Sequence, residues 1–95
     1  MNIVTKLSDT RVQVQGSISS VNAAEFETEL LSVISGQTLV IDAENLKYIS
    51  SAGLRVILKA QKAMSAKDGM KLLHVNETIM EIFEITGFSD ILTIE

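Results

Sequence analysis

Two adjacent serines, Ser50 and Ser51, are the strongest candidates in the sequence for a functional site, because their hydroxyl groups can bind or carry a phosphate. Two small residues follow them, and they stand between an apolar run that ends at Ile49 and a helical repeat that begins at Leu54. Serines at the start of a helix have three common roles: an N-cap hydroxyl, a phosphate-binding group or a phosphorylation target. The residue pattern alone leaves the first and the last of these open.

A phosphoserine at this position is physically reasonable. The first N–H groups of a helix lack partners, and the dipole end there is positive, so a phosphate is tolerated locally. The modification adds a charge of about −2, which alters any surface that docks on a partner. Ala52 and Gly53 leave the serines uncrowded, so an enzyme could reach them.

The other polar candidates are Asp42, Glu44 and His74. Asp42 ends an apolar strand, and the carboxyl ends of strands gather ligand sites in open α/β sheets, although a loop-capping aspartate is the simpler interpretation. The two acids form no recognisable acid–base pair, and His74 lies in a strand pattern, where we assign it no chemistry. Because no nucleophile is paired with a base and no glycine-rich nucleotide motif occurs, the sequence predicts a protein without enzymatic activity.

The residue pattern in the first half of the chain predicts a β-hairpin followed by a helix. Two short alternating runs are joined by a tight turn at Ser8-Asp9. A helix is expected over residues 22–35, with Asn22 as its N-cap, Glu25 as the capping-box partner and Gly36 as its end.

The second half alternates strands and helices. Strands are expected over residues 38–43, 70–75 and 91–95, one helix follows the two serines, and another runs from the cap Asn76 to Gly87. The order ββαβαβαβ predicts an α/β fold with a mixed, mostly parallel sheet, an N-terminal hairpin and three main helices. All of it fits one domain over residues 1–95.

Composition excludes several classes of protein. The chain has 95 residues, no cysteine and one histidine, which excludes disulfide scaffolds, thiolate metal sites and histidine-rich metal sites. Its net charge of −4 argues against nucleic-acid binding. No apolar run reaches the roughly 20 residues of a membrane span, and the N-terminus lacks a signal-peptide pattern. We therefore expect a cytoplasmic monomer with no metal, cofactor or membrane contact.

The run LVIDAENLKYISSAGLRVILKAQKAM resembles the central signature of STAS domains, and within them the bacterial anti-sigma factor antagonists. The segments VQVQGSISSVNAAEFE and GMKLLHVNETIMEIFEITGFSDILTI resemble the flanking elements of the same family, so the similarity covers nearly the whole chain. The resemblance implies a single STAS domain, in agreement with the order of elements expected above.

The resemblance also implies a function. An unphosphorylated antagonist binds an anti-sigma factor that is also a serine kinase of the GHKL ATPase type, and so releases the sigma factor. Phosphorylation of a serine at the start of the second helix ends the complex, and a PP2C-type phosphatase restores it. Aligned on Gly53-Leu54, Ser51 takes the place of that serine, with Ser50 as the fallback.

Two acids of the family pattern are absent. Ser50 stands where an aspartate is usual, and Ile18-Ser19 replaces a Leu-Asp pair after the second strand. A non-switching STAS scaffold or a ligand-sensing domain is therefore the alternative function. The expected partner interface comprises the serine loop, the exposed side of the following helix and a neighbouring turn: Ser17, Ser19, Ser20, Ser50, Ala52, Gly53, Arg55 and Lys59. A solvated helix face is the simpler interpretation of the last two residues.

Overall fold

The computed structural model describes residues 3–34 and 38–95. In chain order the elements are β1 (Val4–Lys6), β2 (Arg11–Val14), β3 (Gly16–Ile18), α1 (Ala23–Ser32), β4 (Leu39–Asp42), β5 (Leu46–Ile49), α2 (Ser51–Ser65), β6 (Met70–Leu73), α3 (Glu77–Thr86), the 3₁₀ helix η1 (Phe88–Asp90) and β7 (Thr93–Ile94).

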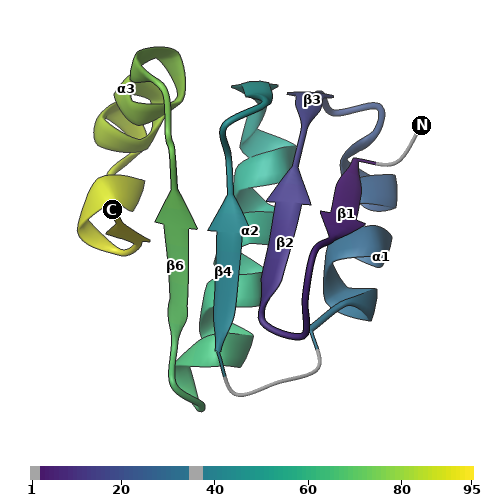
Figure 1. The fold of residues 1–95 in the computed structure, drawn as a ribbon. Helices are drawn as coiled ribbons and strands as arrows, with labels where there is room; N and C mark the ends of the chain where they lie inside the picture. Colours follow the sequence, from purple (N-terminus) through teal and green to yellow (C-terminus); the bar gives the residue numbers. More distant parts are fainter. Residues whose placement is uncertain (1–2, 35–37) are drawn as a thin grey trace.

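Five strands form the main sheet in the order β1-β2-β4-β6-β7. Only the β1–β2 pair is antiparallel, and the other three pairs are parallel. Helices α1 and α2 lie behind the sheet in Figure 1, while α3 lies at the β6 edge. The predicted mixed, mostly parallel sheet with its N-terminal hairpin and three helices is confirmed.

The core lies between the sheet and its helices. Each helix buries one stripe of apolar side chains, as the helical spacing in the sequence predicts. The largest side chains with almost no exposed surface come from all three helices and from the strands that they cover: Phe26, Leu30, Ile57, Met64, Ile79, Phe83, Ile41 and Leu72.

A second, two-stranded sheet was not predicted. Strands β3 and β5 pair in parallel, with Ser17 opposite Tyr48 and Ile18 opposite Ile49. Each strand is only three or four residues long, which is too short for a clear alternating pattern. Their pairing joins segments about 30 residues apart, and this small sheet brings the turn after β3 to the start of α2.

The prediction for the first helix was wrong in two details. The helix spans Ala23–Ser32 rather than residues 22–35, and the side chain of Asn22 caps none of its N–H groups. That side chain instead accepts a hydrogen bond from the Ser19 N–H and donates one to the Ser17 carbonyl. It is engaged by the preceding turn and is therefore not available as a cap. Gly36, the expected helix end, lies outside the described residues.

The predicted boundaries of α3 are confirmed. The side chain of Asn76 accepts a hydrogen bond from the Ile79 N–H at 2.9 Å. At the other end, Gly87 adopts a left-handed conformation with φ of 81°. Glycine adopts this conformation without steric cost, and it commonly ends helices. No helix within the described parts of the chain combines the length and the apolar character that a membrane crossing requires.

Candidate functional site

Ser50 and Ser51 occupy different positions at the start of α2. Ser50 is the N-cap, with an extended backbone, and its Oγ accepts a hydrogen bond from the Gly53 N–H at 3.2 Å. Ser51 is the first helical residue and is exposed, and its hydroxyl has no hydrogen-bond partner among the described residues. The two hydroxyls therefore differ in their surroundings: that of Ser50 has a local structural role, and that of Ser51 faces solvent.

The turn after β3 lies against this helix start. The Ser50 N–H donates to the Ile18 carbonyl at 2.8 Å. Ser17 and Ser20 are exposed, and Ser19 is half-buried. The Oγ of Ser19 accepts from the Val21 N–H, which holds the turn in shape.

Gly53 has a steric role at this junction. It is buried, and a Cβ atom added to it would lie 2.7 Å from Cγ1 of Ile49 and 2.8 Å from Cγ2 of Ile18. Only a residue without a side chain lets α2 start this close to the β3–β5 sheet. Gly53 therefore positions the serines and presents no side chain to a partner.

Arg55 and Lys59 lie one and two turns farther along α2, and both are exposed. Together with residues of α1 they line a shallow hollow of about 180 Å³, whose other lining residues are Ala23, Ala24, Glu27, Ala52 and Val56. Lys59 pairs with Glu27 of α1 at 2.5 Å. Arg55 makes no ion pair or side-chain hydrogen bond among the residues that the structure describes.

Two exposed apolar residues near the serines were not predicted as part of the site. Val21 is 90% exposed and lies in the turn between β3 and α1, and Tyr48 on β5 is 48% exposed and stands opposite Ser17. Contiguous exposed apolar patches rimmed by polar residues mark protein–protein interaction sites, whereas single exposed apolar side chains are ordinary. An apolar residue inside the polar run SSVN was the available signal for Val21.

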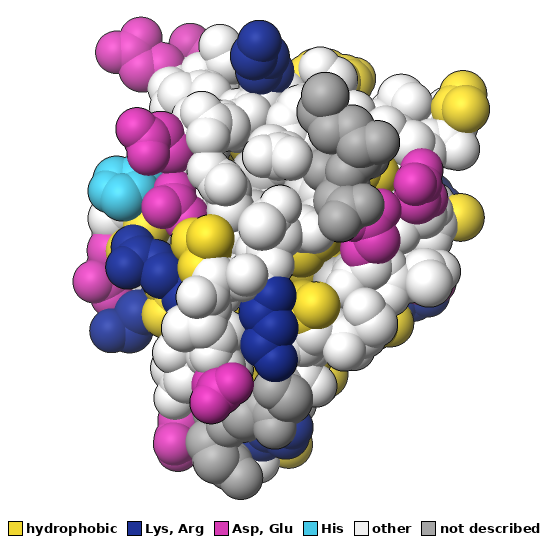
Figure 2. All heavy atoms as spheres, turned by 45° about the vertical axis from the view of Figure 1, so that its right-hand side comes forward, with side chains coloured by type: hydrophobic (Ala, Val, Ile, Leu, Met, Phe, Trp, Pro, Cys, Tyr) yellow, Lys and Arg dark blue, Asp and Glu magenta, His cyan; other side chains and the backbone are white. Residues whose placement is uncertain are grey.

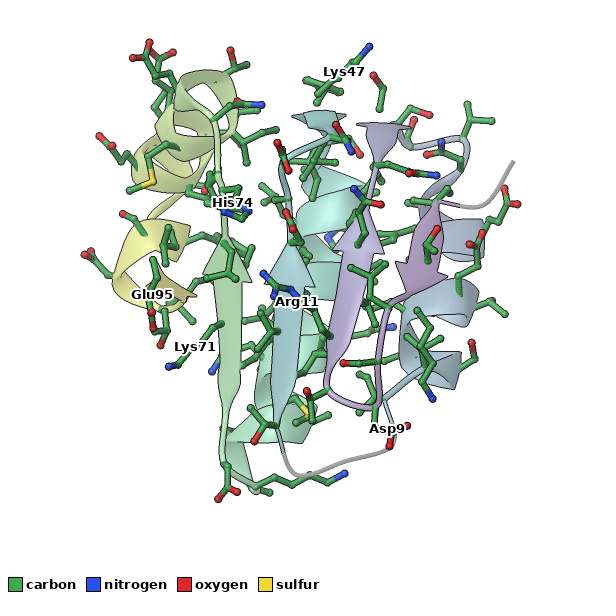
Figure 3. All side chains as sticks on the ribbon, viewed as in Figure 1. Asp9, Arg11, Lys47, Lys71, His74 and Glu95 are labelled. Atoms are coloured by element: carbon green, nitrogen blue, oxygen red, sulfur yellow. The ribbon has the colours of Figure 1, made fainter. Side chains whose placement is uncertain are left out.

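A separate polar cluster lies at the carboxyl end of β4. Oδ1 of Asp42 lies 3.0 Å from Nδ1 of His74 and accepts from the Glu44 N–H, while Oδ2 lies 3.9 Å from Nη2 of Arg11. Figure 3 shows Arg11 and His74 on the same face of the sheet, and in Figure 2 the cyan histidine lies beside acidic and basic side chains. The loop-capping role weighed for Asp42 is therefore present, with His74 as an additional partner.

Electrostatics and backbone geometry suggest that this cluster is structural. Burial alone would raise the pKa of Asp42, but the hydrogen bonds from His74 and the Glu44 N–H, with the charges of His74 and Arg11, hold this pKa below its usual value. His74 has φ of 59°, a left-handed conformation that costs a non-glycine residue about 1 kcal/mol. The hydrogen bond between His74 and Asp42 connects the loop that leads into α3 to the end of β4.

The same cluster contains residue types that can bind a metal ion. Ligand atoms of Asp42, Glu44 and His74 lie within 4.8 Å of one another. However, the Arg11 guanidinium already supplies positive charge to Asp42. Both oxygens of Asp42 are engaged by protein groups, so we interpret the cluster as an ion-pair network. None of the contacts of this cluster within the described residues involves Ser50 or Ser51.

The family model for the STAS domain matches residues 1–95, and the chain therefore belongs to the STAS domain family. Among curated relatives, it is 38% identical over 81 residues to BtrV of Bordetella bronchiseptica, a protein named as an anti-sigma factor antagonist. That match covers 82% of this chain and 70% of BtrV.

Solved structures with the same fold carry related descriptions. An anti-sigma factor antagonist from Mycobacterium paratuberculosis superimposes with a TM-score of 0.83 at 21% identity, over 99% of this chain and 83% of that chain. The phosphorylated form of the Bacillus cell fate determinant SpoIIAA superimposes with a TM-score of 0.67 at 16% identity, over 97% of this chain and 88% of that chain. At these identities the likeness concerns the fold.

Proposed function

We propose that this protein is a cytoplasmic anti-sigma factor antagonist whose binding is switched by phosphorylation of Ser51. In the unphosphorylated state it binds an anti-sigma factor that is also a GHKL-type serine kinase, and the sigma factor is released. The kinase then phosphorylates Ser51 and the complex separates, and a PP2C-type phosphatase restores the binding state. The observation that carries this proposal is the exposed hydroxyl of Ser51 at the first residue of α2, without a partner in the described chain.

The choice of Ser51 over Ser50 follows from their environments. The Ser50 hydroxyl is half-buried and accepts the Gly53 N–H, so modifying it would remove the cap of α2. A phosphate on Ser51 projects into solvent beside the free N–H groups of the first turn, where negative charge is favoured. The fold therefore tolerates modification of Ser51, while the surrounding surface changes its charge.

The proposed partner surface surrounds this hydroxyl. The exposed apolar side chains of Val21 and Tyr48 supply hydrophobic contact, and Arg55 supplies positive charge on α2, beside Lys59 in its ion pair with Glu27. The polar edge consists of the exposed serines of the neighbouring turn, Ser17 and Ser20. A charge of about −2 within such a surface opposes its burial against a partner, because a desolvated charge without a counter-ion is costly.

The absent family acids are compatible with this function. Serine and aspartate are similarly good N-caps, and Ser50 makes the cap bond that an aspartate would make. Ser19 is integrated in the turn through its hydrogen bonds with Val21 and Asn22. Both replacements preserve the local structure and remove negative charge from the neighbourhood of Ser51.

Two variants that add the same charge at adjacent positions test the proposal. The anti-sigma factor kinase is first captured from the source cells with the unphosphorylated protein, and its affinity is then measured by titration calorimetry. Ser51→Asp is expected to weaken binding at least tenfold, because the charge lies in the interface. Ser50→Asp, which keeps the cap, is expected to bind within about threefold of the wild type, since an aspartate caps as well as a serine does.

The modification itself is mapped by mass spectrometry after incubation with the captured kinase and ATP. Phosphate on Ser51 is expected, and phosphate on Ser50 would transfer the switch to the neighbouring residue. If an active kinase leaves both serines unmodified and Ser51→Asp binds as well as the wild type, the protein is a non-switching STAS scaffold.

A further inference from the structure

We propose that Arg55 binds the phosphate of phosphorylated Ser51, so that the modified state is held by an ion pair within α2. This inference rests on the proposed modification of Ser51 and assigns Arg55 a role in its regulation. Arg55 thus has two states: a cation on the partner surface before modification, and the counter-ion of the phosphate after it.

The spacing of the two residues supports this pairing. They are four positions apart on α2, and such residues are neighbours on a helix surface, with Cβ atoms about 6 Å apart. Helical side chains tilt toward the N-terminus, so the side chain of Arg55 is directed toward the turn that contains Ser51. Both side chains are exposed, which leaves space for a phosphate between them.

The charges around the hollow between α1 and α2 leave Arg55 as the available cation. The hollow contains one acid, Glu27, and two bases, Arg55 and Lys59. Glu27 is paired with Lys59. The first turn of α2 contains no acidic residue, and Arg55 makes no ion pair within residues 3–34 and 38–95. A phosphate on Ser51 would therefore meet a guanidinium that no described acid already occupies.

Arginine is suited to this role because its planar guanidinium donates two parallel hydrogen bonds to phosphate oxygens. Formation of the pair has two consequences for the switch. The phosphate adds negative charge to the proposed surface, and it also withdraws a positive charge that the partner contacts. A phosphatase must then break the pair before it removes the phosphate.

The test uses full-length protein in which phosphoserine is incorporated at position 51 during translation. The second pKa of the phosphate, which is about 6 in an unperturbed phosphoserine, is measured by ³¹P NMR during a pH titration. Since a cation favours the dianion, this pKa is expected to be about 0.2 to 0.4 units lower in the wild type than in Arg55→Ala and Arg55→Gln. The matched control is Lys62→Ala, which removes an exposed cation about three helical turns away from Ser51 and should leave the pKa at its wild-type value.

Equal pKa values in the wild type and both Arg55 variants, with native circular dichroism, would overturn the proposal. A shift of the same size in Lys62→Ala would also overturn it, because the effect would then be the general field of the helix. Because the phosphoserine is supplied by translation, this result is independent of any kinase. Failure of the kinase to modify Ser51 would instead count against the proposed function and leave the measured ion pair unaffected.

Discussion

The N-termini of α2 and α3 are built alike and differ in charge. Their caps, Ser50 and Asn76, have nearly the same extended backbone, and each side chain accepts the N–H three residues later. The next residue is Ser51 in α2 and Glu77 in α3. The helix start of α3 thus carries a permanent acid, while that of α2 carries a neutral hydroxyl.

One turn farther along, the two helices carry opposite charges. Four residues after the first helical position stands Arg55 in α2 and Glu81 in α3. Phosphorylation of Ser51 would give α2 the negative helix start that α3 has permanently, and in α2 this charge would lie near a cation, Arg55, that α3 lacks at the equivalent position. The comparison indicates that a helix start in this fold accepts negative charge, so a modification there changes the surface rather than the structure.

The largest difference between the two helix starts is expected in the free energy of unfolding that is lost when each cap residue is replaced by alanine. Asn76 also donates to the Leu46 carbonyl at 2.8 Å, whereas the Ser50 side chain makes only its cap bond among the contacts of the described chain. Asn76→Ala is therefore expected to lower the free energy of unfolding by about 2 kcal/mol and Ser50→Ala by about 1 kcal/mol. Urea denaturation measures both, and equal losses would contradict the tertiary role assigned to Asn76.

A smaller effect is expected at the third helical position, which is Gly53 in α2 and the buried Ile79 in α3. Gly53→Ala places a methyl group within 2.8 Å of two isoleucines, at a cost of about 1–3 kcal/mol for overpacking, and gains about 1 kcal/mol in helix propensity. The net loss of unfolding free energy is expected to be about 1 kcal/mol. The control is Thr78→Ala, which changes an exposed residue in the first turn of α3. A Gly53→Ala variant that is more stable than the wild type would show that α2 can shift away from the two isoleucines.

The smallest difference between the two helix starts is expected when the pH is lowered. Acid should destabilise the start of α3, which follows the loop held by Asp42 and His74, more than the start of α2. Because the pKa of Asp42 is lowered in the folded protein, its contribution to stability is present above the unfolded pKa of about 4 and is lost as the pH falls through the folded value. Below pH 4, amide exchange at Ile79 should therefore accelerate more than exchange at Gly53. Asp42→Asn should abolish this difference, and the same acceleration at both amides in the wild type would refute it.

The sequence predicted most elements because their signals are local. The cap and the glycine end of α3, the apolar stripe of α2 and the Ser8-Asp9 turn each depend on residues close in the chain. Asn22 shows the limit of this reasoning: its residue type and position match an N-cap, but Ser17 and Ser19 use its hydrogen bonds. A local pattern does not reveal which of two possible partners a polar side chain binds.

The candidate site likewise has features that the sequence predicts and features that depend on tertiary structure. Sequence alone determined that two serines stand at a helix start beside small residues, because periodicity and composition are properties of the chain. Only the tertiary structure decided that the turn after β3 lies against the helix start with the two serines, and that His74 contacts Asp42. Those outcomes depend on the β3–β5 pairing and on the β4–β6 neighbourhood, which join residues about 30 positions apart. The energy of such contacts depends on packing in three dimensions, and no local pattern records it.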